Sequence, residues 1–113
     1  MPLRKLTEAE EGFLQFMIEK AKLKMKEDWK LTIRAAPMDE GGMGSLVLFP
    51  NGTQSGSRSF GRTAAEYEFK DADRATVVAS LNLDQAGELF ELDIWKTTFE
   101  PLIRFPETEP NSQ

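Results

Sequence analysis

The residues best suited to chemistry are carboxylates that recur at every second position of two segments. Glu66 and Glu68 stand in the first segment, and Glu91 and Asp93 stand in the second, followed by Trp95. Alternate side chains of a β-strand point to the same face, so each pair would share one face of its strand. Carboxylates gathered in this way can share a proton, hold a hard cation or bind a basic protein.

The chain has neither cysteine nor histidine among its 113 residues. The lack of cysteine excludes disulfides, thiol nucleophiles and zinc–thiolate sites. The lack of histidine removes the usual general base near neutral pH and the commonest transition-metal ligand. The carboxylates also show no EF-hand spacing and have no second catalytic group beside them. We therefore expect no catalytic residues, no metal site and no cofactor, and a protein that is not an enzyme.

The charge balance restricts the partners that the chain could bind. The formal net charge is −5, which disfavours a nucleic-acid backbone and an anionic membrane surface. No stretch approaches the ~18 apolar residues of a membrane-spanning helix, and no apolar signal core is present. We expect a cytoplasmic protein without nucleic-acid or membrane partners, for which a basic protein is the fitting partner. The oligomeric state stays open.

The spacing of apolar residues predicts one helix near the N-terminus, from about Glu8 to Lys26. Thr7 and Glu10 form a capping box, in which each side chain satisfies a free amide of the first turn. Glutamates at the start and lysines at the end suit the helix dipole. The apolar side chains that share one face at helical spacing are Phe13, Leu14, Met17, Ile18, Ala21 and Met25.

The rest of the chain reads as β-structure. The apolar period changes to two at Trp29, which predicts a strand over 29–36, and a short apolar strand follows at 45–49. The glycine-rich run 41–44 precedes a strand and has no lysine near it, so it predicts a hairpin rather than a phosphate loop. Residues 51–62 read as a long loop or a weak edge strand. Three strand patterns separated by turn signals, at 64–70, 75–82 and 88–96, predict a meander.

The pairing of the last three strands can be predicted from the side chains that must be buried. A four-residue turn, 84–87, would place Leu81 opposite Phe90, because a slip by one residue would turn every side chain to the other face. The same argument places Tyr67 opposite Ala79. The outer face would then carry three rows across the strands: Glu66–Ser80–Glu91, Glu68–Val78–Asp93 and Lys70–Thr76–Trp95.

The outer face formed by Glu66, Glu68, Glu91, Asp93 and Trp95, here called the acidic face, has three interpretations. It is a solvated sheet surface with Trp95 covered by the C-terminal segment, a partner-binding surface, or a proton-sharing or metal site. We take these five residues as the candidate partner-binding site. Two other functions stay open: a carboxylate-dependent enzyme, and a small-ligand-binding domain. The ligand pocket would lie between helix and sheet, lined by Phe13, Met17, Trp29 and Tyr67.

The predicted fold class is α+β, with one N-terminal helix packed on an antiparallel sheet of about five strands that ends in a meander. We expect a single domain over residues 1–106 and a disordered polar tail over 107–113. The order of the strands before the last three stays open.

Two motifs resemble those of a known family. They are Gly41-Gly42-Met43-Gly44-Ser45-Leu46 and Phe90-Glu91-Leu92-Asp93-Ile94-Trp95-Lys96, the second followed by Phe99 and Pro101-Leu102. With the opening Arg4-Lys5-Leu6-Thr7-Glu8, the chain is similar to a family of small uncharacterised bacterial proteins, a domain of unknown function, from Arg4 to about Pro106. The family brings no catalytic residues to carry over. Short acidic proteins of this kind often serve as antidotes to toxins, so the resemblance implies an immunity-like role.

Overall fold

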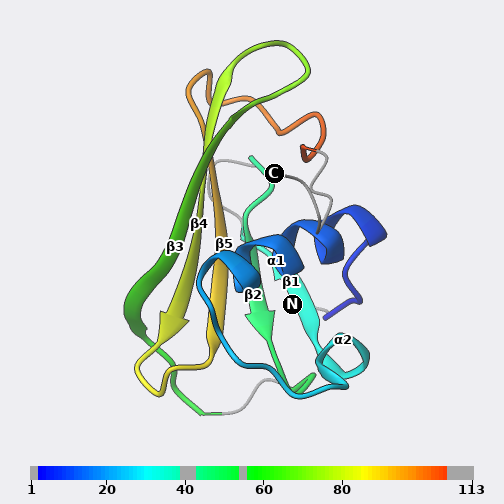
Figure 1. The fold of residues 1–113 in the computed structure, drawn as a ribbon, viewed down its shortest axis with the longest axis vertical. Coiled ribbons are helices and arrows are strands. Elements are labelled where there is room, and N and C mark those ends of the chain that lie inside the picture. The colour runs from blue at the N-terminus through cyan, green and yellow to red at the C-terminus, as the bar shows by residue number, and fades with distance from the viewer. Residues whose placement is uncertain (1–2, 39–42, 54–55, 107–113) are drawn as a thin grey trace.

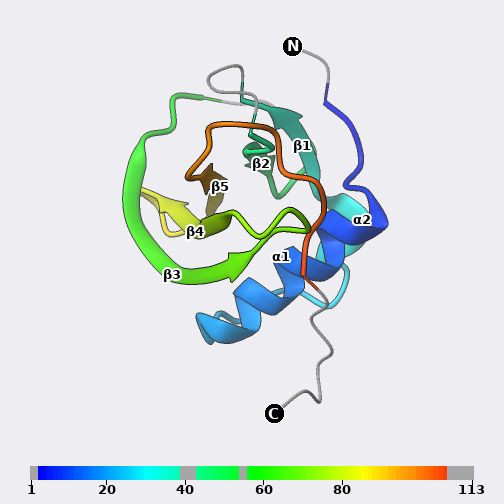
Figure 2. The same cartoon turned by 90° about the horizontal axis from the view of Figure 1, so that it is seen from above.

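The computed structural model describes residues 3–38, 43–53 and 56–106. Within them the elements run, in chain order, α1 (Glu8–Lys20), α2 (Trp29–Thr32), β1 (Arg34–Pro37), β2 (Leu46–Phe49), β3 (Phe60–Lys70), β4 (Thr76–Asp84) and β5 (Leu89–Lys96). The strands form one antiparallel sheet in the order β1-β2-β5-β4-β3, and α1 lies across one face of it (Figures 1 and 2). The predicted α+β class, with a helix on a five-stranded sheet ending in a meander, is confirmed. None of the helices in these residues is long and apolar enough to cross a membrane.

The core forms between α1 and the inner face of the sheet. Four side chains of α1 are buried: Phe13, Leu14, Met17 and Ile18. They meet buried side chains from all five strands: Ala35, Leu46, Leu48, Phe69, Val77, Ala79, Leu81, Leu92 and Ile94. Full burial of one large aliphatic or aromatic side chain stabilises the fold by about 1.5–3 kcal/mol. The inner face of the sheet is thereby fixed, and the alternate side chains of β3, β4 and β5 are left on the opposite, outer face.

The predicted helix is right at its start and wrong at its end. The capping box is present, with the Glu10 amide donating to the Thr7 hydroxyl at 3.1 Å. The helix ends at Lys20 because Lys22 adopts the left-handed conformation, with φ of 58°. Its amide donates to the Glu19 carbonyl, and the Leu23 amide donates to the Ile18 carbonyl. These two bonds form a Schellman motif, which normally uses glycine, so the lysine-rich sequence carried no sign of it.

The strand predicted to begin at Trp29 is also wrong, because residues 29–32 form the single helical turn α2. The Ile33 amide donates to the Trp29 carbonyl, which closes the turn. The turn packs Trp29 against the core and leaves Leu31 76% exposed. Trp29 and Leu31 stand two residues apart, as apolar residues on one face of a strand do, but only Trp29 faces the core. The spacing alone therefore suggested a strand. The strand begins only at Arg34, the first residue of β1, and there Ala35 and Ala36 are both buried.

The connections between strands follow the turn signals in part. β1 and β2 are antiparallel neighbours, as a hairpin requires, and the Met38 amide donates to the Ser45 carbonyl at 3.0 Å. Gly41 and Gly42 of the predicted turn lie outside the described residues, as does the predicted disordered tail 107–113. The segment interpreted as a loop or weak edge strand becomes a strand at Phe60, where β3 begins.

The predicted register is confirmed between β3 and β4 and is wrong by two residues between β4 and β5. Tyr67 lies opposite Ala79 as expected, but Leu81 lies opposite Leu92 rather than Phe90. One residue of the shift arises in the turn after β4, where the Asp84 carboxylate accepts the backbone amides of residues 86 and 88, and the other arises at an irregularity between Asn82 and Leu83. Leu83 then pairs with Leu89, which enters the core, and Phe90 is half-buried without a partner on β4. From Glu91 onward the shift by two residues keeps each side chain on its predicted face, whereas Leu89, predicted to face outward, is buried.

Candidate functional site

The structure places all five predicted site residues on the outer face of the sheet, opposite α1. The corrected register changes which of them are neighbours. Asp93 of β5, rather than Glu91, now shares a row with Ser80 and Glu66. The observed rows across β3, β4 and β5 are Thr63–Asn82–Glu91, Glu66–Ser80–Asp93 and Glu68–Val78–Trp95. The acidic face therefore consists of two columns of longer side chains, on β3 and β5, with shorter side chains of β4 between them.

The carboxylates of the acidic face have no ion-pair partner within the described part of the chain. Glu91 accepts a hydrogen bond from the side-chain amide of Asn82 at 3.2 Å, and Asp93 accepts one from the Ser45 hydroxyl at 3.1 Å. Both donors are neutral, so neither hydrogen bond compensates a negative charge. Such a surface attracts cations and positively charged partners. No group of three Asp or Glu residues that could hold a metal ion is found in the described ranges, so the geometry gives the metal interpretation no support.

Trp95 lies at one end of the acidic face and remains 44% exposed. Phe99, from the segment after β5, meets the indole ring edge-on, with ring centroids 6.0 Å apart. The C-terminal segment therefore covers Trp95 only in part, although the solvated-surface interpretation expected it to be covered. A partly exposed tryptophan held in place by a neighbour is a typical anchor of protein interfaces.

A buried charge cluster at the same end of the sheet was missed in the sequence. Lys96 shares the inward face with Leu92 and Ile94, and its side chain is only 1% exposed. Its ammonium donates to the carboxylates of Asp71 and Asp73, each at 2.8 Å. The sequence held a signal for this cluster. Lys96 follows Leu92 and Ile94 at every second position of β5, so its side chain should face inward as theirs do. The turn Asp71-Ala72-Asp73 connects β3 to β4, and the antiparallel pairing of β4 with β5 brings this turn beside the end of β5.

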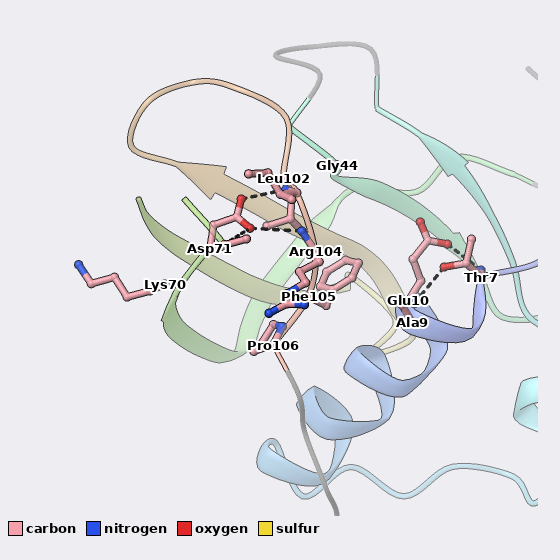
Figure 3. A pocket seen from close by; sticks show the side chains of 12 residues that line it. Thr7, Ala9, Glu10, Gly44, Lys70, Asp71, Leu102, Arg104, Phe105 and Pro106 are labelled. Atoms are coloured by element: carbon pink, nitrogen blue, oxygen red, sulfur yellow. Dashed lines mark hydrogen bonds between the residues drawn. The ribbon is translucent and has the colours of Figure 1, made fainter. Parts of the chain in front are cut away.

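Asp71 links this cluster to the segment after β5, residues 97–106, here called the strap. Its carboxylate accepts the backbone amides of Ile103 at 2.8 Å and Arg104 at 3.2 Å (Figure 3). Burial alone would raise the pKa of Asp71, but the Lys96 ammonium and the backbone amides outweigh it and lower the pKa to about 2. The strap is held further by Phe105, whose ring stacks on Phe13 with centroids 4.9 Å apart. Lys96 and Asp71 therefore form a structural latch.

Arg58 forms a second structural cluster. Its guanidinium donates to the Asp84 carboxylate at 2.9 Å and to the carbonyls of Leu48 and Leu89. It also lies 4.9 Å from the centroid of the Phe90 ring. Burial would raise the pKa of Asp84, but Arg58 and the turn amides lower it. Arg58 thus joins β2, the turn after β4 and β5, and its donors are used within the fold.

Two of the four residues expected to line a pocket between helix and sheet, Phe13 and Met17, are instead fully buried in the packed core. A hollow of about 850 Å³ lies instead between the start of α1, the turn after β3 and the strap (Figure 3). Its walls combine charged and apolar side chains, among them Glu10, Lys70, Leu102 and Phe105. Glu10 is already bound by the Arg4 guanidinium at 2.8 Å. The hollow has the size of a small-ligand site.

Comparison with known proteins identifies the family of the chain but assigns it no function. Neither curated proteins nor solved structures gave a match to the chain. One family model matches, that of a domain of unknown function, DUF6984, and it covers residues 3–106. The resemblance inferred from the motifs to a family of unknown function is thereby confirmed. The chain belongs to the DUF6984 family.

Proposed function

We propose that this domain is a non-enzymatic protein-interaction module whose acidic face binds a basic partner protein. One observation carries the proposal: Glu66, Glu68, Glu91 and Asp93 share one face with the exposed ring of Trp95 and form no ion pair with any residue that the structure describes. The carboxylates would guide the approach of a basic surface, and Trp95 would supply contact area once it has docked. An immunity-like role for a bacterial protein in the cytoplasm fits this proposal.

The contrast with the rest of the molecule supports this assignment. The charges that hold the fold together, at Lys96 and Arg58, are paired and buried or half-buried. The carboxylates of the acidic face make no comparable contact, so the fold gains little from them. They add a concentrated negative charge on one surface, which raises the association rate of a positively charged protein.

The test is binding of a synthetic oligolysine peptide, measured by isothermal titration at two salt concentrations. We expect binding that weakens as salt rises, because salt screens exposed charges over about 8 Å at physiological ionic strength. The double variant Glu91→Lys/Asp93→Lys should bind several-fold more weakly. The matched control is Glu27→Lys/Glu88→Lys, which makes the same change in net charge at exposed positions off the acidic face. Equal weakening by both double variants would show that only net charge matters and would refute a binding site on this face.

Chelation separates the protein-binding proposal from a metal site. If the acidic face held a hard cation, EDTA would lower the melting temperature of the isolated protein, because a ligand of the native state stabilises it. We expect no change. A clear drop would overturn the proposal in favour of cation binding.

The hollow beside the strap supports a second candidate function, binding of a small ligand. Its apolar wall at Leu102 and Phe105, beside the charged residues Glu10 and Arg104, suits a small amphipathic molecule. A thermal-shift screen of metabolites tests this function. The variant Leu102→Trp, which would fill the hollow, should abolish any shift; a shift that persists in this variant would place the ligand elsewhere.

A further inference from the structure

β3 is the free edge of the sheet along one side. It is last in the strand order, and Figure 1 shows it at the margin of the sheet, with no other described helix or strand beyond it. Among the described residues, no backbone hydrogen bond joins its outer edge to another segment. Every second amide and carbonyl of an edge strand points outward and is available to a further strand. β3 therefore offers a template for strand addition.

Only the second half of β3 is regular enough to accept a strand. Two irregularities in its pairing with β4 fall near Gly61 and Ala64, and such bulges twist an edge away from a new partner. From Ala65 to Lys70 the pairing is continuous. This stretch of about 20 Å, at ~3.3 Å per residue, is long enough to pair with about six residues of an extended chain.

The side chains along this stretch define what an added strand would need. On the outer face Glu66 and Glu68 are exposed, two residues apart, and have no ion pair within the described residues. On the inner face Tyr67 is half-buried and packs edge-on against Phe16 of α1, with ring centroids 4.8 Å apart. Residues of an added strand would alternate in the same way, since strand side chains point to opposite faces in turn.

We propose that β3 accepts an extended segment of the partner as a sixth strand, with Lys or Arg at alternate positions opposite Glu66 and Glu68 and apolar residues between them against Tyr67 and Phe16. This inference rests on the proposed function and narrows the basic partner to an amphipathic basic strand. Main-chain hydrogen bonds would supply affinity, as in other complexes formed by strand addition. Opposite charges directly across neighbouring strands would fix the register.

The test compares two synthetic peptides of about eight residues and equal composition, long enough to span the regular stretch of β3. In one, lysine alternates with valine; in the other, all lysines precede all valines. We expect the alternating peptide to bind about tenfold more tightly. It should also slow hydrogen exchange at the outward-pointing amides between Ala65 and Lys70, measured residue by residue by NMR, because only a paired strand protects them.

Charge variants locate the bound peptide. Glu66→Lys/Glu68→Lys should weaken the alternating peptide by roughly tenfold, because two cross-strand attractions become repulsions. Glu91→Lys/Asp93→Lys, two strands away, should weaken it by no more than about threefold, as screened exposed charges do. The melting temperature of each variant shows that the fold is intact.

Each alternative has its own outcome. Binding without protection of the β3 amides, with Glu66→Lys/Glu68→Lys and Glu91→Lys/Asp93→Lys equally weakened and the control Glu27→Lys/Glu88→Lys weakened less, would mean that the partner lies across the acidic face. This outcome overturns strand addition and leaves the proposed function standing. Failure of every basic peptide to bind would overturn the proposed function as well. Protection of the same amides that grows with protein concentration in the absence of peptide would mean that a second copy pairs with β3, which also overturns the proposal.

Discussion

Replacing Asp71 by asparagine tests the latch that holds the strap. Oδ2 of Asp71 accepts the Lys96 ammonium and the Ile103 amide, each at 2.8 Å, and its side chain is fully buried. Asp71→Asn would put an NH₂ group in place of this oxygen, facing two donors. The loss of one charged and one neutral hydrogen bond predicts a cost of about 2 to 4 kcal/mol in the free energy of unfolding. The other oxygen can still accept the Ala72 and Arg104 amides.

The assay is urea unfolding at pH 7, with hydrogen exchange at the Ile103 amide as a local probe. The Ile103 amide should exchange faster in the variant because the strap opens locally. The exchange rates of the buried β4 amides should change only as much as the change in global stability requires. Asp73→Asn is the matched control: its carboxylate is 35% exposed and accepts no strap amide, so it should cost far less. A cost below about 1 kcal/mol for Asp71→Asn, or an equal cost for both variants, would refute the latch.

The same latch has a pH signature. The pKa of Asp71 is lowered to about 2 from its usual 3.8, so the folded state favours the ionised form. The stability that this carboxylate contributes is complete at neutral pH and is lost as the pH falls from about 4 towards 2. The difference in stability between the native protein and Asp71→Asn should therefore shrink across this window. A constant difference from pH 7 to pH 2 would contradict the assigned pKa.

Two further substitutions test the corrections to the predicted fold by urea unfolding. Leu92→Ala should lower the free energy of unfolding by about 2–5 kcal/mol, because it leaves a cavity in the core. Phe90→Ala should lower it by only about 1–2 kcal/mol, since Phe90 is half-buried against Arg58. Equal losses would mean that Phe90 is a core residue after all. Lys22→Gly should stabilise the protein by about 1 kcal/mol, because Lys22 is held at a φ of 58° that costs an L-residue more than glycine; a loss of stability would mean that the lysine side chain is needed at the helix end.

The parts of the fold that the sequence predicts are those with long, regular patterns. The apolar stripe and capping box of α1, and the alternation along β3, β4 and β5, each extend over enough residues to show that the element forms and which of its faces is buried. The two failures near α1 have local causes. Lys22 adopts the left-handed conformation and ends the helix at a position where glycine is usual. The helical turn 29–32 carries Trp29 and Leu31 two residues apart, which is also the spacing of apolar residues in a strand. Both depend on backbone conformations that residue types do not specify.

The candidate site shows the same division. Parity was enough to place Glu66, Glu68, Glu91 and Asp93 on one face, because an error of two residues preserves the face. It could not give their neighbours, which depend on how Asp84 tightens the turn before β5. Lys96 was overlooked because a lysine at a strand end normally reaches solvent. Its burial depends on two carboxylates that are more than twenty residues away in the sequence.

The exposed pair on β3 provides a last test of whether the acidic face serves binding rather than stability. Glu66 and Glu68 lie on one face about 6.8 Å apart, and two like charges at that distance repel by roughly 0.6 kcal/mol in water. Glu66→Gln/Glu68→Gln should therefore raise the free energy of unfolding by about 0.5 kcal/mol at low salt, and the gain should vanish at high salt, where the charges are screened. The same variant should bind a basic peptide more weakly. A loss of stability at low salt would show that the two carboxylates hold the fold together; a gain in stability with no loss of binding would leave them as solvated surface. Greater stability together with weaker binding is the result expected if these charges are kept for a partner.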